Sequence, residues 1–122
     1  MPNDCWNNIT ITASESDLDA LMRTEFIDVP EGAIDILQRG QYGVMIRLWS
    51  AWIPNFIWME TLLPTYPSCW VKNEWREEGG TAGVWVGTLV EGQRMIQRME
   101  WKDLSVEEMH VFRSAAEDAP SA

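Results

Sequence analysis

The sequence predicts a single α+β domain with a mostly antiparallel sheet of four to five strands, two main helices on one face and an added C-terminal helix. Several segments of the 122-residue chain alternate apolar and polar residues with a period of two, which is typical of half-buried strands. Two other segments begin with a capping residue and continue with apolar residues that are three and four apart, which is typical of helices. A tight turn at residues 91–93 joins two strands as an antiparallel hairpin. We expect residues 1–118 to form this domain and 119–122 to be a disordered tail.

The first strand and the first helix are predicted near the N-terminus. Residues 8–12 alternate apolar and polar side chains and are therefore interpreted as a strand. Ser14 is the expected N-cap of a helix, because Asp17 follows it in the place of the capping-box glutamate. This helix should end near Thr24. Its buried face is formed by three residues at helical spacing, Leu18, Leu21 and Met22.

The middle of the chain is predicted as a short helix, a strand, a longer helix and a second strand. The short helix covers residues 31–37, and residues 42–49 alternate as a strand. Pro54 suits the first turn of the longer helix, where its missing N–H costs nothing. Residues 68–76 again alternate as a strand. The inward-facing residues of the short helix would be Ile34 and Leu37.

Two strands and a last helix are predicted towards the C-terminus. Residues 84–90 and 94–101 alternate with a period of two and form the arms of the hairpin. Ser105 and Glu108 have capping-box spacing, which predicts the start of the C-terminal helix.

Charge and cysteine content exclude several classes of function. The net charge of −10 argues against nucleic-acid binding, which needs clustered Lys and Arg, and favours a protein partner with a basic surface. Cys5 and Cys69 are predicted as buried free thiols, and with His110 they are too few to hold zinc or an iron–sulfur cluster. No cofactor or metal is therefore expected. The chain has no apolar run long enough for a membrane span and no secretory signal at its start, which points to the cytoplasm.

The charges are distributed unevenly along the chain. Residues 15–35 carry seven acids and one Arg, whereas residues 36–99 carry six bases and five acids. The acids therefore lie mostly on the predicted helices and the bases on the predicted strands. On these strands, six Trp and basic residues are predicted to share the sheet face opposite the helices: Arg47, Trp49, Trp70, Lys72, Trp85 and Arg98. Arg76 and Arg94 are expected beside them.

The sequence leaves three interpretations of this face open. Trp and Arg together are typical of protein-binding hot spots. They are also typical of the stacking platforms that bind single-stranded nucleic acid. Alternatively, they stack on one another across the strands beneath the C-terminal helix and bind nothing. An exposed edge strand or a Trp-rich face would also allow a homodimer.

Several blocks of the sequence resemble a known family. They are the opening Met1–Ile11, the extended Phe26–Glu31, the turn Trp49–Pro54 followed by Tyr66-Pro67, and Glu77–Gly80. These blocks are similar, over about residues 1–90, to the ferredoxin-like domain family of phage and plasmid proteins of the YubB type. The resemblance implies a ferredoxin-like α/β sandwich without a cluster, an origin in a mobile element and no established enzymatic activity.

The predicted function is that of a non-catalytic acidic interaction protein of a phage or mobile element. It would bind and inhibit a host defence protein, as anti-CRISPR or anti-restriction proteins do. The alternative is an RNA-recognition-like module that uses the Trp and Arg face. The candidate acidic contact residues are Glu15, Asp17, Asp19, Glu107 and Glu108. Two groups of carboxylates that could serve acid–base catalysis are interpreted as solvated surface: Asp28, Glu31 and Asp35, and Glu74, Glu77 and Glu78.

Overall fold

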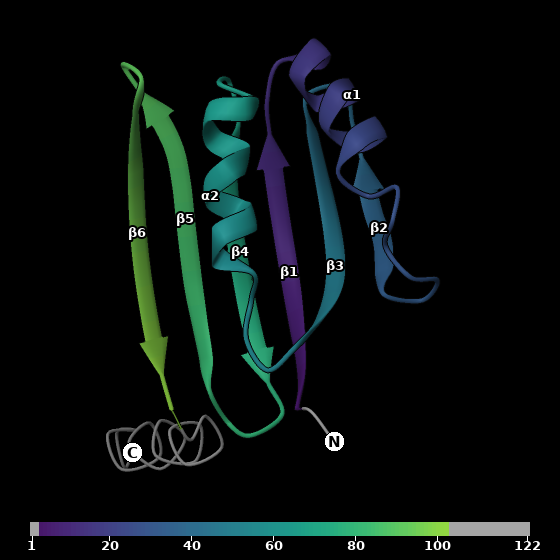
Figure 1. The fold of residues 1–122 in the computed structure, drawn as a ribbon, viewed down its shortest axis with the longest axis vertical. Coiled ribbons are helices and arrows are strands. Elements are labelled where there is room, and N and C mark those ends of the chain that lie inside the picture. The colour runs from purple at the N-terminus through teal and green to yellow at the C-terminus, as the bar shows by residue number, and fades with distance from the viewer. Residues whose placement is uncertain (1–2, 103–122) are drawn as a thin grey trace, which may run out of the picture.

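The computed structural model describes residues 3–102 of the chain. They form six strands and two helices (Figure 1). In chain order these are β1 (Asp4–Thr12), α1 (Glu15–Thr24), β2 (Ile34–Arg39), β3 (Gly43–Ala51), α2 (Phe56–Thr65), β4 (Trp70–Glu77), β5 (Ala82–Val90) and β6 (Gln93–Trp101).

All six strands belong to one sheet in the order β2-β3-β1-β4-β5-β6, and every neighbouring pair is antiparallel. The first strand, β1, therefore lies inside the sheet between β3 and β4. α1 connects β1 to β2, and α2 connects β3 to β4. Figure 1 shows both helices lying over the same face of the sheet. The other face carries neither helix.

The predicted fold class was wrong. The sheet has six strands rather than four to five. Residues 3–102 are mostly β with two helices, and they do not form the predicted four-to-five-stranded ferredoxin-like α+β domain. The predicted C-terminal helix and the predicted tail at 119–122 lie outside the described residues.

The strand that sequence reasoning missed is β2, which replaces the short helix predicted over residues 31–37. β2 pairs with β3, and its register shifts between Ile36 and Gln38, as in a β-bulge. The extra residue interrupts the alternation. In the sequence, the apolar residues Ile34 and Leu37 are three apart, a spacing that is typical of a helix and that led to the helix prediction.

The core lies between the two helices and the sheet. Ser14 caps α1 by accepting a hydrogen bond from the Asp17 amide at 3.2 Å, as its capping-box position predicts. Asn55 caps α2 in the same way by accepting from the Trp58 amide at 3.0 Å, so α2 begins after Pro54 rather than at it. The buried residues of the two helices are Leu18 and Leu21 in α1, and Met59, Leu62 and Leu63 in α2.

Two glycines of β5 make room for tryptophans on the helix-covered face. A Cβ at Gly87 would lie 2.5 Å from the Trp85 ring, and one at Gly83 would lie 2.7 Å from the ring of Trp75. The absence of side chains at these positions lets both rings lie against the strand. Trp85 is consequently 1% exposed and belongs to the core.

The hairpin between β5 and β6 was predicted and is confirmed. Val90 pairs with Gln93, which leaves Glu91 and Gly92 as a two-residue turn. Both turn residues have positive φ, 51° and 79°, as a type I′ turn requires. This turn matches the twist of the strands and holds β6 beside β5 along its whole length.

Candidate functional site

The candidate site is the face of the sheet opposite α1 and α2, which we call the open face. Side chains of a strand alternate between the two faces. The register places the even-numbered residues of β1, β4 and β5, and the odd-numbered residues of β3 and β6, on the open face. Several of these side chains are apolar and exposed: Trp6 is 44% exposed, Met95 55% and Met99 66%.

A row of tryptophan and arginine crosses the open face at one end of the sheet. Trp6 on β1 pairs with Trp49 on one side and with Arg76 on the other. Arg76 pairs with Ala82, and Ala82 pairs with Trp101. Residues paired in this way lie about 4.5 to 5.5 Å apart at Cα, so the row is continuous across five strands. We call it the Trp–Arg row.

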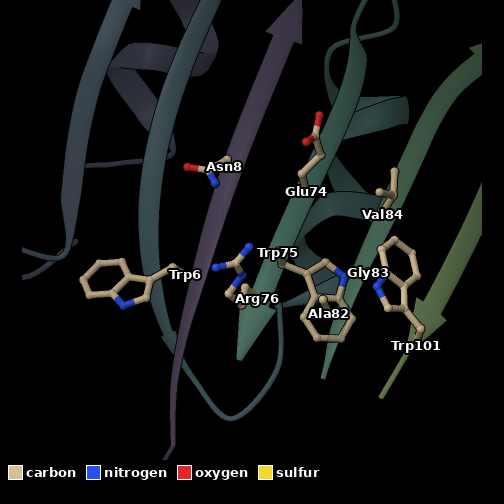
Figure 2. A pocket seen from close by; sticks show the side chains of 9 residues that line it. All are labelled: Trp6, Asn8, Glu74, Trp75, Arg76, Ala82, Gly83, Val84 and Trp101. Atoms are coloured by element: carbon tan, nitrogen blue, oxygen red, sulfur yellow. The ribbon is translucent and has the colours of Figure 1, made fainter. Parts of the chain in front are cut away.

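The Trp–Arg row forms one end of a shallow groove of about 520 Å³. Figure 2 shows Trp6 on one side of this groove, Trp101 on the other and Arg76 between them. A second hollow of about 630 Å³ lies over β5 and β6 and shares Val84 and Trp101 with the first. The open face is therefore hollowed over at least three strands.

The cations of the open face differ in their partners. Lys72 forms an ion pair with Glu74 at 2.9 Å. Within residues 3–102, Arg47 and Arg76 form no ion pair with a carboxylate. The ring of Trp49 is held in place because its Nε1 donates to Asp4 Oδ1 at 2.7 Å. The face thus offers two exposed guanidinium groups beside the fixed ring of Trp49 and the exposed ring of Trp6.

Four of the six predicted Trp and basic residues lie on the open face: Arg47, Trp49, Trp70 and Lys72. Arg76 also lies there, as expected. The placement of the other two was wrong, and so was that of Arg94, which pairs with Leu89 on the helix-covered face. Trp85 pairs with Asn73 on the helix-covered face and is buried in the core. Arg98 pairs with Trp85, and its guanidinium carbon lies 3.7 Å from the ring centroid of Phe56 in α2, a cation–π contact. Both faces of β5 are apolar, so alternation alone did not distinguish them.

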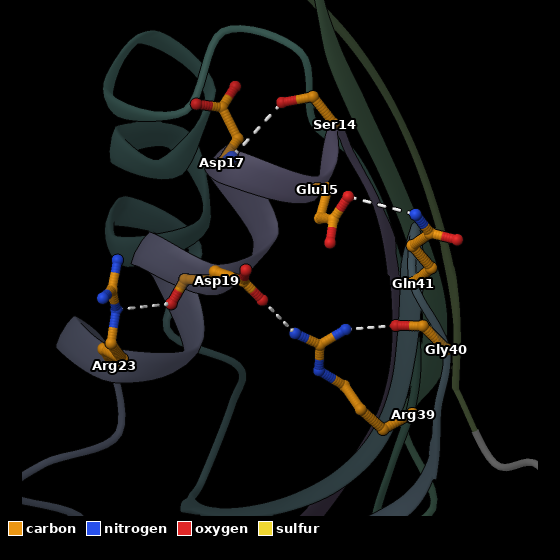
Figure 3. A network of polar contacts seen from close by, with 8 residues as sticks. All are labelled: Ser14, Glu15, Asp17, Asp19, Arg23, Arg39, Gly40 and Gln41. Atoms are coloured by element: carbon orange, nitrogen blue, oxygen red, sulfur yellow. Dashed lines mark hydrogen bonds and ion pairs between the residues drawn. The ribbon is translucent and has the colours of Figure 1, made fainter.

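The predicted acidic residues of α1 form contacts within the chain (Figure 3). Asp19 pairs with Arg39 at 2.7 Å, and Glu15 accepts from Gln41 at 3.0 Å. Asp17 accepts from the backbone amide and the hydroxyl of Ser68 at 3.1 and 2.6 Å. These carboxylates therefore tie α1 to neighbouring loops and to β2. The other two predicted acids, Glu107 and Glu108, lie outside the described residues.

Sequence reasoning missed Trp6 and Trp101 as residues of the site. The alternation that marked residues 8–12 as a strand extends back to Asp4, and Trp6 has the same parity as Asn8. The buried Asn7 hid this extension, because a polar residue on the core side interrupts the expected pattern. Trp101 has the parity of Met99 and could have been placed by the hairpin register.

The described part of the chain, residues 3–102, contains no cluster of three His, Cys, Asp or Glu side chains able to hold a metal ion. Cys5 and Cys69 are buried free thiols, as predicted. Burial raises the pKa of the Cys5 thiol, and burial with the nearby charge of Asp17 raises the pKa of Cys69 to about 11. Such thiols are poor nucleophiles near neutral pH. Of the six carboxylates considered for catalysis, Glu74 alone lines the groove, where it pairs with Lys72.

Comparison with known proteins adds no family to these observations. No protein-family model, curated protein or solved structure matches the chain. The resemblance to the YubB-type family therefore stays a prediction. Among the described residues, no helix is long and apolar enough to cross a membrane.

Proposed function

We propose that this protein is a non-catalytic binding protein and that its open face docks a protein partner. The observation that carries the proposal is the Trp–Arg row, which lines a groove on a sheet face that neither helix covers. Trp and Arg are the residues most enriched at the energetic centres of protein interfaces. The groove gives them a hollow in which a partner's side chain would be desolvated.

The chemistry of the open face indicates the kind of partner surface that would fit. Arg47 and Arg76 would bind carboxylates of the partner, because a carboxylate can accept two hydrogen bonds from one guanidinium. The half of the face over β5 and β6 is apolar instead, with Val84, Val86 and Met99 around the second hollow. A protein segment can present carboxylates and apolar side chains together. The predicted partner with a basic surface would meet the acids elsewhere on the chain, and it stays a prediction.

Single-stranded nucleic acid is the second candidate ligand. The observation in its favour is that exposed Trp6 lies beside Arg76, whose guanidinium forms no ion pair within residues 3–102. Bases stack on indole rings, and arginine contacts phosphate. Two observations favour protein over this candidate. The chain carries a net charge of −10, and Lys72 is already neutralised by Glu74.

The mobile-element origin of the chain and a host defence protein as its target rest on the sequence resemblance. We retain the mobile-element origin as part of the proposal for this chain, and a host defence protein as the proposed partner. The open face supports the coarser statement of protein binding, and it does so independently of that resemblance.

The proposal is tested by affinity capture from a bacterial lysate with matched variants. Trp6→Ala and Arg76→Glu change the centre of the Trp–Arg row at exposed positions, so both variants should fold. Each should lose the captured partner, since hot-spot residues contribute about 2 kcal/mol or more, which is roughly 30-fold in affinity. Ile57→Ala is the control, because Ile57 is 75% exposed on α2 and belongs to the other face. If both row variants capture every protein that the wild type and Ile57→Ala capture, the open face is not the docking surface.

The nucleic-acid candidate is distinguished by a direct titration. Fluorescence anisotropy of a labelled single-stranded RNA should stay flat with the wild-type protein at about 50 mM salt, where phosphate contacts are strong. Binding that falls with added salt and is lost in Arg76→Glu would favour the second candidate.

A further inference from the structure

The strand β6 forms one edge of the sheet and carries none of the backbone features that usually protect an edge. It follows β5 over nine paired residues, from Gln93 to Trp101, without a register shift. It also contains no proline. One side of an edge strand presents a row of N–H and C=O groups that can pair with another strand.

The opposite edge is built differently. β2 has six residues, and its pairing with β3 is interrupted by the bulge between Ile36 and Gln38. Short length and bulges are devices that discourage pairing between sheet edges. The backbone of the protein thus protects one edge of its sheet and leaves the other long and regular, with charged side chains along β6 as the remaining feature that would select its partner.

We propose that β6 pairs antiparallel with β6 of a second copy of this chain, about a two-fold axis through Gln97. Gln97 is the midpoint of β6, so this register pairs all nine residues of the strand. Antiparallel pairing about an axis is self-complementary, as the interface of a two-fold dimer must be. The two six-stranded sheets then form one continuous sheet.

The charges of β6 favour this register. On the helix-covered face, it places Arg94 opposite Glu100 of the partner subunit, and the same pair recurs across the axis. Each Glu100 also pairs with Arg98 of its own chain, so its carboxylate would lie between two guanidinium groups. On the open face, it places the exposed Met95 opposite Met99 of the partner subunit. Opposite charges thus meet on the helix-covered face and methionines meet on the open face. The remaining pair on the helix-covered face is Ile96 and Arg98 of the partner subunit, which brings no like charges together.

The neighbouring registers bring like charges together. An axis through Ile96 would place Arg94 opposite Arg98 of the partner subunit, twice. An axis through Arg98 would place the two copies of that arginine opposite one another. Like charges directly opposite each other destabilise a pair of strands. Full overlap and charge complementarity therefore select the same axis, through Gln97.

The dimer would place both open faces on the same side of the joined sheet. Each Trp–Arg row ends at Trp101, which the pairing sets opposite Gln93 of the partner subunit, so the two rows lie at opposite ends of β6. Two grooves on one rigid sheet would bind a partner with two sites more tightly than either groove alone. The dimer interface itself does not depend on the proposed function, because it uses the edge of the sheet rather than its face.

The register is tested by cysteine crosslinking of the full chain. Antiparallel neighbours lie about 4.5 to 5.5 Å apart at Cα, within the range that a disulfide spans. Gln97→Cys should form a disulfide-linked dimer under mild oxidation. Gln93→Cys is the control: its two copies would lie eight residue steps apart, roughly 26 Å, and should not crosslink. The native thiols Cys5 and Cys69 are buried, so the oxidised wild type should contain no disulfide-linked dimer.

The charge pairing is tested by reversal and exchange, with the oligomeric state measured by sedimentation. The wild type should dimerise at roughly 10 to 100 µM. Arg94→Glu and Glu100→Arg should each weaken dimerisation by about tenfold or more, because two ion pairs become two repulsions. The double variant R94E/E100R should restore it. A monomeric wild type, absence of the Gln97→Cys crosslink, or a double variant no better than the single ones would each overturn the proposal. A monomeric wild type is the result expected if residues 103–122 cover the edge. A dimer without the Gln97→Cys crosslink is the result expected if the copies meet through their open faces.

Discussion

Asn73 on β4 donates from Nδ2 to Oδ1 of Asn7 on β1 at 2.9 Å, inside the core. The Nδ2 of Asn7 donates in turn to the carbonyl of Leu48 and to the hydroxyl of Ser50 on β3, both at 2.9 Å. Three neighbouring strands are therefore joined by side-chain hydrogen bonds as well as by their backbones. Because polar groups buried in a core are costly when unpaired, this network favours one register of the sheet over slipped alternatives.

Substitution of Asn7 should be strongly destabilising. Asn7→Ala removes three hydrogen bonds and leaves the buried Asn73 amide with only the Met59 sulfur as a partner, at 3.5 Å, which should lower the free energy of unfolding by roughly 2 to 4 kcal/mol. Urea denaturation followed by fluorescence measures this change. Asn8→Ala is the matched control, since Asn8 is the next residue of β1 and lies exposed on the open face. Its effect should stay within about 0.5 kcal/mol. Equal losses in the two variants would show that the network contributes little.

The sequence predicts the parts of this fold that depend on local chemistry. The cap at Ser14 and the turn at Glu91 and Gly92 were predicted because their hydrogen bonds and backbone angles are set by a few adjacent residues. β2 was not predicted, because the bulge after Ile36 exists only through pairing with β3. The spacing of the apolar residues in β2 depends on how this strand pairs with β3, and the residues of β2 alone do not reveal that pairing.

The candidate site could be predicted only in part, for a similar reason. Alternation identified which residues of β3 and β4 share a face, and it placed Arg47 and Lys72 correctly. It did not identify which face of β5 is covered, because both sets of side chains on that strand are apolar. The position of Trp85 depends on Gly87, whose missing side chain leaves space for the ring. Glycine two residues from tryptophan on an apolar strand is the signal that would have placed Trp85 in the core.

A methyl group at Gly83 should destabilise the sheet. The added Cβ would lie 2.7 Å from the carbonyl oxygen of Met99 on β6 and 2.7 Å from the ring of Trp75. Neither neighbour is a flexible side-chain end, so Gly83→Ala should lower the free energy of unfolding by roughly 1 to 3 kcal/mol. Gly40→Ala is the control, because the atom nearest to its added Cβ lies at 3.7 Å, an ordinary contact distance. A loss no greater than that of the control would mean that β5 and Trp75 shift at little cost.

The buried thiol of Cys69 should make stability depend on alkaline pH. Its pKa is raised from 9.0 to about 11, mainly by burial, so the folded protein holds this proton more tightly than the unfolded chain. The resulting stability is fully present below pH 9 and is lost as the pH rises through about 11, which amounts to roughly 2 to 3 kcal/mol. Urea denaturation measures the free energy of unfolding at pH 8 and at pH 11. Between these two pH values it should fall less in Cys69→Ala than in the wild type. Cys5 and Tyr66 also have raised pKa values, so the variant should still lose some stability over this range. Identical falls would rule out a neutral buried Cys69 as a source of the effect.

Substitutions of the acidic residues of α1 should distinguish a structural role of these residues from a role in binding. Asp17 accepts two hydrogen bonds from Ser68, the residue that leads into β4. Bonds to a charged acceptor are stronger than neutral ones, so Asp17→Ala should lower the free energy of unfolding by about 1 to 2 kcal/mol. Glu15→Ala should change it by no more than about 0.5 kcal/mol, because Glu15 is exposed and has a single bond to Gln41. If the open face is the docking surface, Glu15→Ala captures the same lysate proteins as the wild type. Loss of those proteins in Glu15→Ala, with stability unchanged, would instead place the partner on the acidic surface of α1.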